Sequence, residues 1–341
     1  MKITKIPKFN NLGIYVDDYD LLNASAEDFQ TLYTELSATN LLIIFRNTNI
    51  TAPTLSNRLS SIGNRSFQLR SLFRKYNLGF KDVPNITRNI KDLGNLGISL
   101  EDAEVIQHAF TKVMVAEYST NTTVTKLVGS KVDDSRFLEG ELNWHQDESA
   151  DIAFCDSIAL LGETAMKQSA TGFVTTAAWF ESQTETFKSE LRDMVGIHEF
   201  QTSEFNPNMD RLERAVVECS TGYDKRIPLV VNAANGMPGM HLSTSTLVGI
   251  EGMPTKEFQL LMDKIAREVF SEENIYDHWY QQDNDLLLFD NSITMHRRIG
   301  TTLGRVAYRS PYDLKERLAA RYNQNELNDQ YQEILTNFLT R

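Results

Sequence analysis

Cysteine is scarce in this sequence, which has only Cys155 and Cys219 among its 341 residues. Two cysteines in so long a chain cannot build the disulfide framework on which small secreted domains depend. This scarcity favours a reducing compartment, and we expect the protein to be cytoplasmic. Cys155 lies in an apolar stretch and is expected to be part of the core.

Long hydrophobic runs are also missing. No apolar stretch approaches the ~20 residues that a helix needs to cross a bilayer. The first residues, MKITKIP, lack the apolar centre and the cleavage site of a secretory signal. We therefore expect neither a membrane partner nor export.

Positive charge is in deficit, because 46 acidic residues outnumber 34 lysines and arginines and give a formal net charge of −12. Nucleic-acid binding needs a basic face, so nucleic acid is not expected as a partner. Glycine and proline are scattered along the chain, and no repeat or low-complexity tract marks a linker. We expect a single domain over residues 1–341.

Three segments have the apolar periodicity of helices. Ser25 and Asp28 match the capping pattern of a helix start. The apolar residues that follow at helical spacing are Phe29, Leu32, Tyr33 and Leu36. Similar patterns predict one helix near residues 177–194 and another near 256–270, the second with Thr255 as its cap.

Short apolar runs, typical of strands, dominate the second half of the chain. With the earlier run LLIIFRN, they read TVTKLVGS, DIAFCDSIALLGE, MVGIHEF, RIPLVVNA, MHLSTSTLVGI, DLLLFDN and RVAYRSPY. Such strands predict a mainly β fold with added helices (α+β), a sandwich or jelly roll. We divide the chain into an α/β flanking region (1–120), a core (121–313) and a charged helical tail (314–341). We expect this tail either to pack on the core or to contact another subunit of a homo-oligomer.

The stretch NWHQDES contains a histidine and a carboxylate two residues apart, His145 and Asp147. On an extended segment these side chains point to the same side and can reach one ion. Alone, the pair also fits an ordinary surface turn. A further histidine, His296, follows the apolar run DLLLFDN. Two imidazoles and one carboxylate match the facial arrangement of Fe(II) oxygenases, which leaves positions open for a co-substrate and O₂.

Two arginines follow His296 on a strand-like stretch. Arg305 and Arg309 are four residues apart, so both are expected on one face of the strand. A guanidinium is a planar fork that matches a carboxylate, and its position behind a metal ligand favours anion binding over a solvated role. Asp290 and Asn291 are expected to shape the turn before His296.

These motifs together resemble the taurine dioxygenase family of Fe(II)/2-oxoglutarate-dependent oxygenases. The likeness runs over residues 35–313 in the family's order: LLIIFRNTNIT, NWHQDES, SATGFVTTAAWF, RIPLVVNAANGMPGMHLSTSTLVGIEGMP, HWYQQDNDLLLFDNSITMHRR and RVAYR. The resemblance implies a double-stranded β-helix, a form of jelly roll, with flanking helices. It also implies Fe(II) as cofactor, with 2-oxoglutarate, O₂ and a small molecule as substrates.

Carried over to this sequence, the resemblance implies that His145, Asp147 and His296 bind the iron. Arg305 would pair with the distal carboxylate of 2-oxoglutarate. Thr171 would donate a hydrogen bond to the same carboxylate.

Arg309 falls where many members of the family bind an anionic group of the primary substrate. Two departures from the family pattern leave alternatives open. The step of nine residues from His296 to Arg305 is short, which also fits an exchange of roles between Arg305 and Arg309. Ser169–Ala170 replaces the family's paired glycines, so Thr175 is the alternative for the second 2-oxoglutarate contact.

Residues beside the candidate ligands have two interpretations each. Asn143, Glu148 and Ser149 fit substrate contacts as well as solvated or capping roles. Trp144 fits a wall of the site as well as core packing. The histidines not expected to bind metal are His108, His198, His241 and His278. The resemblance brings His241, on a predicted strand, near the pocket, where both packing and substrate contact stay open.

The carboxylate of Asp147 bears on the reaction, because halogenating relatives lack it. Its presence favours hydroxylation of an unactivated C–H bond in a small metabolite, an amino acid or another carboxylate-bearing molecule, with release of succinate and CO₂. The same site could instead give desaturation or ring closure. A non-catalytic jelly-roll binding protein would be expected to have lost a ligand. A zinc hydrolase would not need an arginine–threonine pair that fits 2-oxoglutarate.

Overall fold

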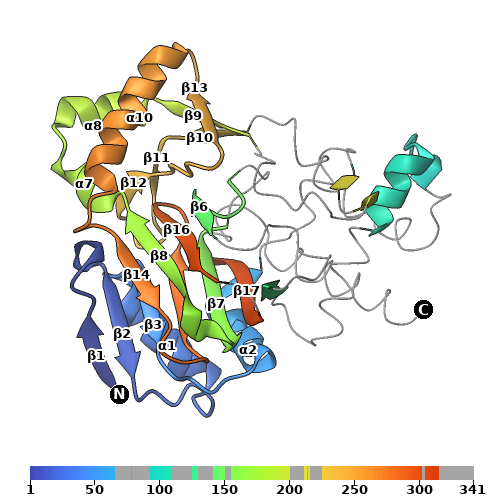
Figure 1. Ribbon diagram of the computed structural model, residues 1–341, viewed down its shortest axis with the longest axis vertical. Helices are drawn as coiled ribbons and strands as arrows, with labels where there is room; N and C mark the ends of the chain where they lie inside the picture. The colour runs from blue at the N-terminus through green and yellow to red at the C-terminus, as the bar shows by residue number, and fades with distance from the viewer. Residues whose placement is uncertain are drawn as a thin grey trace.

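Two β-sheets form the centre of the protein, seen here in a computed structural model (Figure 1). The structure describes residues 1–65, 78, 93–108, 125–129, 141–149, 155–199, 211–212, 214–215, 225–301 and 304–314. The larger sheet contains, in spatial order, β1 (Lys2–Lys5), β2 (Gly13–Asp17), β3 (Leu42–Phe45), β15 (Leu286–Asp290), β7 (Ser157–Thr164), β17 (Arg305–Leu314) and β4 (Gly63–Arg65), and β5 (Thr125–Gly129) also pairs with β17. The smaller sheet contains β14 (Tyr276–Trp279), β8 (Ser169–Thr175), β16 (Thr294–Gly300) and β6 (Leu142–His145).

Apolar side chains from both sheets fill the space between them. They include Leu42, Leu160, Phe173, Leu287, Phe289 and Ala307, all buried. The rings of Phe173 and Phe289, one from each sheet, lie 5.0 Å apart. In the middle of each sheet the neighbouring strands are distant in the sequence, as β3, β15 and β7 are, which agrees with the predicted jelly roll.

Helices α1 (Ala26–Ser37) and α2 (Ala52–Ile62) pack on the outer face of the larger sheet (Figure 1). The predicted capping box is present, because the Ser25 hydroxyl accepts a hydrogen bond from the Asp28 backbone N–H at 3.0 Å. The four predicted apolar positions of α1 are all buried. Strand β15 is buried along its whole length, because α1 and α2 cover one face of its sheet and the core lies against the other.

A lobe of mixed structure lies between β8 and β14 in the sequence and forms the top of Figure 1. Its elements are α7 (Ala177–Ser182), α8 (Glu185–Arg192), β9 (Val195–His198), β10 (Lys225–Pro228), β11 (Val230–Asn232), β12 (Pro238–Met240), β13 (Leu247–Ile250) and α10 (Thr255–Val269). The prediction of a single helix over residues 177–194 is wrong. Gln183 adopts an extended conformation, and Thr184 then caps α8 by accepting from the Phe187 backbone N–H.

Other boundaries also differ from the prediction. Thr255 is the first residue of α10 and not its cap, because Pro254 holds the cap position without a side-chain hydrogen bond. His241 lies after β12 and outside any strand. The helical tail was predicted over residues 314–341. Leu314 ends strand β17, and residues 315–341 lie outside the described residues. Residues 100–108 are helical, and two short 3-10 helices occupy Phe9–Asn11 and Met166–Gln168. Within the described part of the chain, no helix is long and apolar enough to cross a membrane.

Candidate active site

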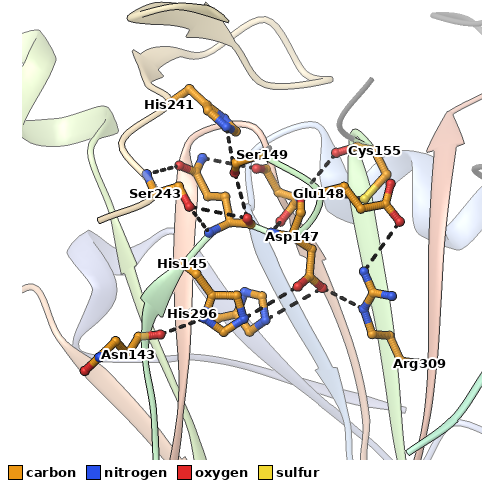
Figure 2. A network of polar contacts seen from close by, with 12 residues as sticks. Asn143, His145, Asp147, Glu148, Ser149, Cys155, His241, Ser243, His296 and Arg309 are labelled. Carbon is orange, nitrogen blue, oxygen red and sulfur yellow. Dashed lines mark hydrogen bonds and ion pairs between the residues drawn. The ribbon is translucent and has the colours of Figure 1, made fainter. Parts of the chain in front are cut away.

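Strand pairing brings two histidines together that are far apart in the sequence. In the register of β16 with β6, His296 lies directly opposite His145. Their ring centroids are 4.2 Å apart. Asp147 follows β6 by two residues and turns its carboxylate towards both rings, as Figure 2 shows.

These three residues form a group with metal-binding spacing. The Nε2 atom of His145 lies 3.5 Å from Oδ1 of Asp147, and Nε2 of His296 lies 3.8 Å from Oδ2. One ligand atom from each residue lies within 4.8 Å of the others. Their side chains are 12–19% exposed, so the group is accessible to a small molecule but largely shielded from solvent.

The protonation of the two imidazoles suits metal binding. Nδ1 of His145 lies 2.6 Å from the backbone carbonyl oxygen of Asn143, which can only accept, so Nδ1 carries the proton. Its Nε2 therefore presents a lone pair to the group. Burial, and next the neighbouring His145, lower the pKa of His296 to about 3 and keep its ring neutral.

The Asp147 carboxylate is ionised despite its burial. Burial by itself would raise the pKa of this carboxyl group. The charge of Arg309 is the largest of the effects that lower this pKa, and together these effects outweigh burial and hold the pKa well below its ordinary value. Nε of Arg309 donates to Oδ2 of Asp147 at 2.7 Å.

Arg309 also contacts a second carboxylate. Its Nη2 lies 3.6 Å from Oε1 of Glu148, so two acidic side chains share one guanidinium (Figure 2). Glu148 has a positive φ of 62°, a backbone conformation that is uncommon for residues other than glycine. This conformation belongs to the turn that carries Glu148 next to Asp147.

Arg305 has a different environment, although both arginines lie on the inner face of β17. The guanidinium of Arg305 is stacked over the Tyr280 ring, with its central carbon 5.6 Å from the ring centroid. Arg305 is only 7% exposed, and among the described residues its Nη1 has no hydrogen-bond partner. The Tyr280 hydroxyl is also 3.0 Å from the hydroxyl of Thr171 on β8. Arg305, Tyr280 and Thr171 therefore form one buried polar cluster.

The profile of the family described as "Taurine catabolism dioxygenase TauD, TfdA family" matches residues 7–310. This match spans most of the chain and includes every residue of both clusters. The chain belongs to the TauD/TfdA family. As a TauD/TfdA dioxygenase it is an Fe(II)/2-oxoglutarate-dependent oxygenase, with Fe(II) as cofactor and with 2-oxoglutarate, O₂ and a small molecule as substrates.

Solved structures share the fold of this TauD/TfdA protein. AAD-2 in complex with Mn(II) and N-oxalylglycine matches with a TM-score of 0.58 and 14% identity, over 92% of this chain and 98% of that one. A taurine dioxygenase from Burkholderia xenovorans matches with a TM-score of 0.59 and 15% identity, over 92% and 90%. A putative α-ketoglutarate-dependent taurine dioxygenase from the same organism has a TM-score of 0.58 and 16% identity, over 92% of each chain. No curated protein sequence matches significantly.

The residues present in this TauD/TfdA protein fit the groups that the family uses. Two neutral imidazoles and an ionised carboxylate are suitable ligands for Fe(II) and leave part of its coordination sphere open. A buried guanidinium nitrogen of Arg305 that has no hydrogen-bond partner in the described part of the chain fits an external carboxylate. The chain thus supplies three metal ligands and, at a second position, a cation for a co-substrate carboxylate.

Several residues beside the ligands point away from the group. Trp144 packs against Phe270 in the helical lobe, with ring centroids 5.5 Å apart. Ser149 is buried, and its hydroxyl donates to the Gln146 carbonyl and contacts Nε2 of His241 at 2.9 Å (Figure 2). Asn143 is exposed and contacts His145 through its backbone carbonyl.

The turn before His296 behaves as predicted. Oδ1 of Asp290 accepts hydrogen bonds from the backbone N–H groups of Ser292 and Ile293 at 2.9 and 2.8 Å. Asn291 also reaches the metal-binding turn, where its side chain accepts from the Asp147 N–H at 2.9 Å and donates to the Asp147 carbonyl at 3.0 Å. This second role of Asn291 was not predicted from the sequence.

The structure brings two further residues to the site that the sequence analysis did not select. Tyr280 ends the motif HWY and joins Arg305 to Thr171. Gln146 separates His145, the last residue of β6, from Asp147 and is buried. Strand alternation was the available signal for Gln146, because a residue between two same-facing ligands points to the opposite side. Nothing in the sequence indicated where Tyr280 would lie.

The structure also shows where the remaining cysteine, histidine and threonine residues considered in the sequence lie. Cys155 is fully buried, as expected. The described histidines His108, His198, His241 and His278 lie outside the metal-binding group, as predicted. The hydroxyl of Thr175 donates to the Ile293 carbonyl and accepts from the Ala177 N–H.

Proposed function

We propose that this protein hydroxylates an unactivated C–H bond in a small, carboxylate-bearing metabolite such as an amino acid, with release of succinate and CO₂. The observation that carries the proposal is the contrast between two arginines on one strand. Arg305 is buried without an acidic partner among the described residues, whereas Arg309 lies against Asp147 of the metal-binding group. One anion site therefore suits a co-substrate, and the other suits a substrate beside the metal.

We propose that His145, Asp147 and His296 hold Fe(II). When bound, the iron together with 2-oxoglutarate and O₂ supplies the oxidising power for C–H cleavage. The chain keeps the two imidazoles neutral and the carboxylate ionised. The Phe289 ring packs at a tilt against the His296 ring, with 5.0 Å between their centroids, and shields this side of the site from water.

We propose that Arg305 and Thr171 bind the distal carboxylate of 2-oxoglutarate. A buried cation is costly unless an anion pairs with it, and a carboxylate can accept two hydrogen bonds from the guanidinium fork. The Thr171 hydroxyl reaches the same cluster through Tyr280. Thr175 is less suited, because its hydroxyl already serves the turn after β8.

We propose that Arg309 and Glu148 orient the primary substrate. Arg309 can pair with a substrate carboxylate, and the adjacent Glu148 carboxylate suits a substrate ammonium group. Such paired, opposite charges favour an amino acid over a simple carboxylic acid. The contacts of Ser149 and Asn143 favour support of the metal-binding turn over direct substrate contact.

The first test needs no knowledge of the substrate. Fe(II) and 2-oxoglutarate are added to the protein without oxygen, and the visible spectrum is recorded. A weak metal-to-ligand charge-transfer band that is missing in His296→Ala is expected. Iron binding without that band would contradict the assignment of Arg305 and Thr171. A change in the band on addition of amino acids would then identify candidate substrates.

We propose that the chain forms a single catalytic domain and that the protein is cytoplasmic. Association into a homo-oligomer would be measured by light scattering of the full chain.

A further inference from the structure

Gln146 lies between two of the proposed metal ligands and is only 2% exposed. Its side-chain amide contacts four backbone groups. Oε1 accepts from the N–H groups of Leu242 and Ser243 at 2.7 and 2.8 Å. Nε2 donates to the carbonyl oxygens of Asn291, at 3.1 Å, and Ser292. The amide thus uses both of its hydrogen atoms and both acceptor positions of its oxygen.

These partners determine the orientation of the amide. Turning it over would place an NH₂ group against two N–H groups and an oxygen against two carbonyl oxygens. A carboxylate of the same length could accept from Leu242 and Ser243 but could donate nothing to Asn291 and Ser292. Only a primary amide at this position satisfies all four groups.

The contacts connect the segments that carry the metal ligands. Gln146 is bonded in the chain to His145 and Asp147. Ser292 precedes His296 by four residues, in the turn that leads into β16. The backbone N–H of Gln146 also donates to Oγ of Ser243 at 3.2 Å. The Gln146 side chain therefore joins the turn after β6, the turn before β16 and the 242–243 segment of the lobe.

We propose that Gln146 is a positioning residue that holds Asp147 and the two histidines at metal-binding separation. The inference rests on the proposed metal site. It differs from a general stabilising role, because the four partners lie on the segments next to the ligands. Loss of the amide should therefore weaken metal binding as well as lower the stability of the fold.

Mn(II) binding to the full chain, measured without 2-oxoglutarate or O₂ from the EPR signal of free Mn(II), tests this inference. Gln146→Leu keeps the volume and removes the amide, and Gln146→Glu keeps the length and removes the donors. Residues that support metal ligands typically affect affinity ~10–100-fold, and we expect an increase of this size in the Kd of both variants.

Asn40→Leu is the matched control. Asn40 is a buried amide that donates to the Leu36 carbonyl at 2.7 Å and accepts from Lys5 at 2.9 Å, beside α1. This variant should lower the melting temperature and leave the Mn(II) Kd within about twofold, because Asn40 touches neither ligand segment.

An unchanged Kd in a folded Gln146 variant would overturn the inference, and so would equal weakening in the Asn40 control. If Gln146→Leu does not fold, the Mn(II) Kd of Gln146→Glu tests the inference by the same criterion. Failure of the unaltered protein to bind Mn(II) would instead refute the metal site itself, and the positioning role with it.

Discussion

Arg305 offers the sharpest test of how the protein binds 2-oxoglutarate. The guanidinium is buried against Tyr280, and its Nη1 lacks a partner among the described residues. Arg305→Met keeps a long apolar stem and removes the charge. The variant should therefore lose the pairing with the distal carboxylate while it preserves the packing on Tyr280.

The expected loss can be estimated from the kind of contact. Removing one partner of a buried, hydrogen-bonded charge pair costs about 2–5 kcal/mol. That range corresponds to a rise in the 2-oxoglutarate Kd on the order of 30- to 5,000-fold. Arg305→Lys keeps the charge without the planar fork, so its effect should be smaller but still measurable.

The thermal stability of the Arg305→Met variant should not fall together with its affinity for 2-oxoglutarate. A buried cation without an acidic partner disfavours the folded state, because folding removes it from water. Arg305→Met removes this cost, so the metal-free variant should melt at the same temperature as the unaltered protein or higher. Loss of affinity without loss of stability is typical of a group that serves binding.

Titration of 2-oxoglutarate into the anaerobic protein at saturating Fe(II) measures the affinity, and calorimetry of the metal-free protein measures the stability. Arg309→Met is the matched control, because Arg309 lies on the same face of β17 but contacts Asp147. A large rise in Kd in Arg309→Met and none in Arg305→Met would refute the assignment. The two arginines would then have exchanged roles.

Three further predictions concern other parts of the molecule. Arg309→Ala should raise the substrate KM at least ~10-fold and leave 2-oxoglutarate affinity nearly unchanged in steady-state kinetics, and equal losses in both would contradict this division. Burial, with a smaller effect of Lys225, lowers the pKa of His198 to about 3. The unfolded chain takes up this proton near pH ~6.5, so stability should fall by ~1.4 kcal/mol per pH unit between ~6.5 and ~3. Urea unfolding at pH 7 and 5 should show a smaller decrease in His198→Leu. Gly300 has a φ of 83°, and an added Cβ would lie 2.4 Å from the Gln168 carbonyl oxygen. Gly300→Ala should therefore lower the free energy of unfolding by about 1–3 kcal/mol. An unchanged midpoint of urea unfolding would show that this backbone strain is absent.

Local chemistry made part of this protein predictable. The capping box of α1 depends on Ser25 and Asp28, three residues apart, and it forms as the sequence indicates. The apolar run of β15 required a buried strand. The candidate ligands were recognisable because His145 and Asp147 are close in sequence and their residue types suit a metal.

Other features were not predicted from the periodicity. The division of the 177–194 helix follows from a local cap, because the Thr184 side chain accepts from the Phe187 N–H and starts a new helix. The position of His241 outside a strand follows instead from contacts with distant residues, Ser149 and Ser292. Single-sequence periodicity carries no information on such partners.

The residue types could be read from the amino-acid sequence alone: two histidines and a carboxylate for a metal, and two arginines on one strand face. The pairing of His296 with His145 across two strands is visible only in the folded chain. Folding also gives the two arginines different environments, because one faces Tyr280 and the other Asp147. Residue type and periodicity are local properties, whereas charge pairing and burial depend on groups that folding brings from elsewhere in the chain.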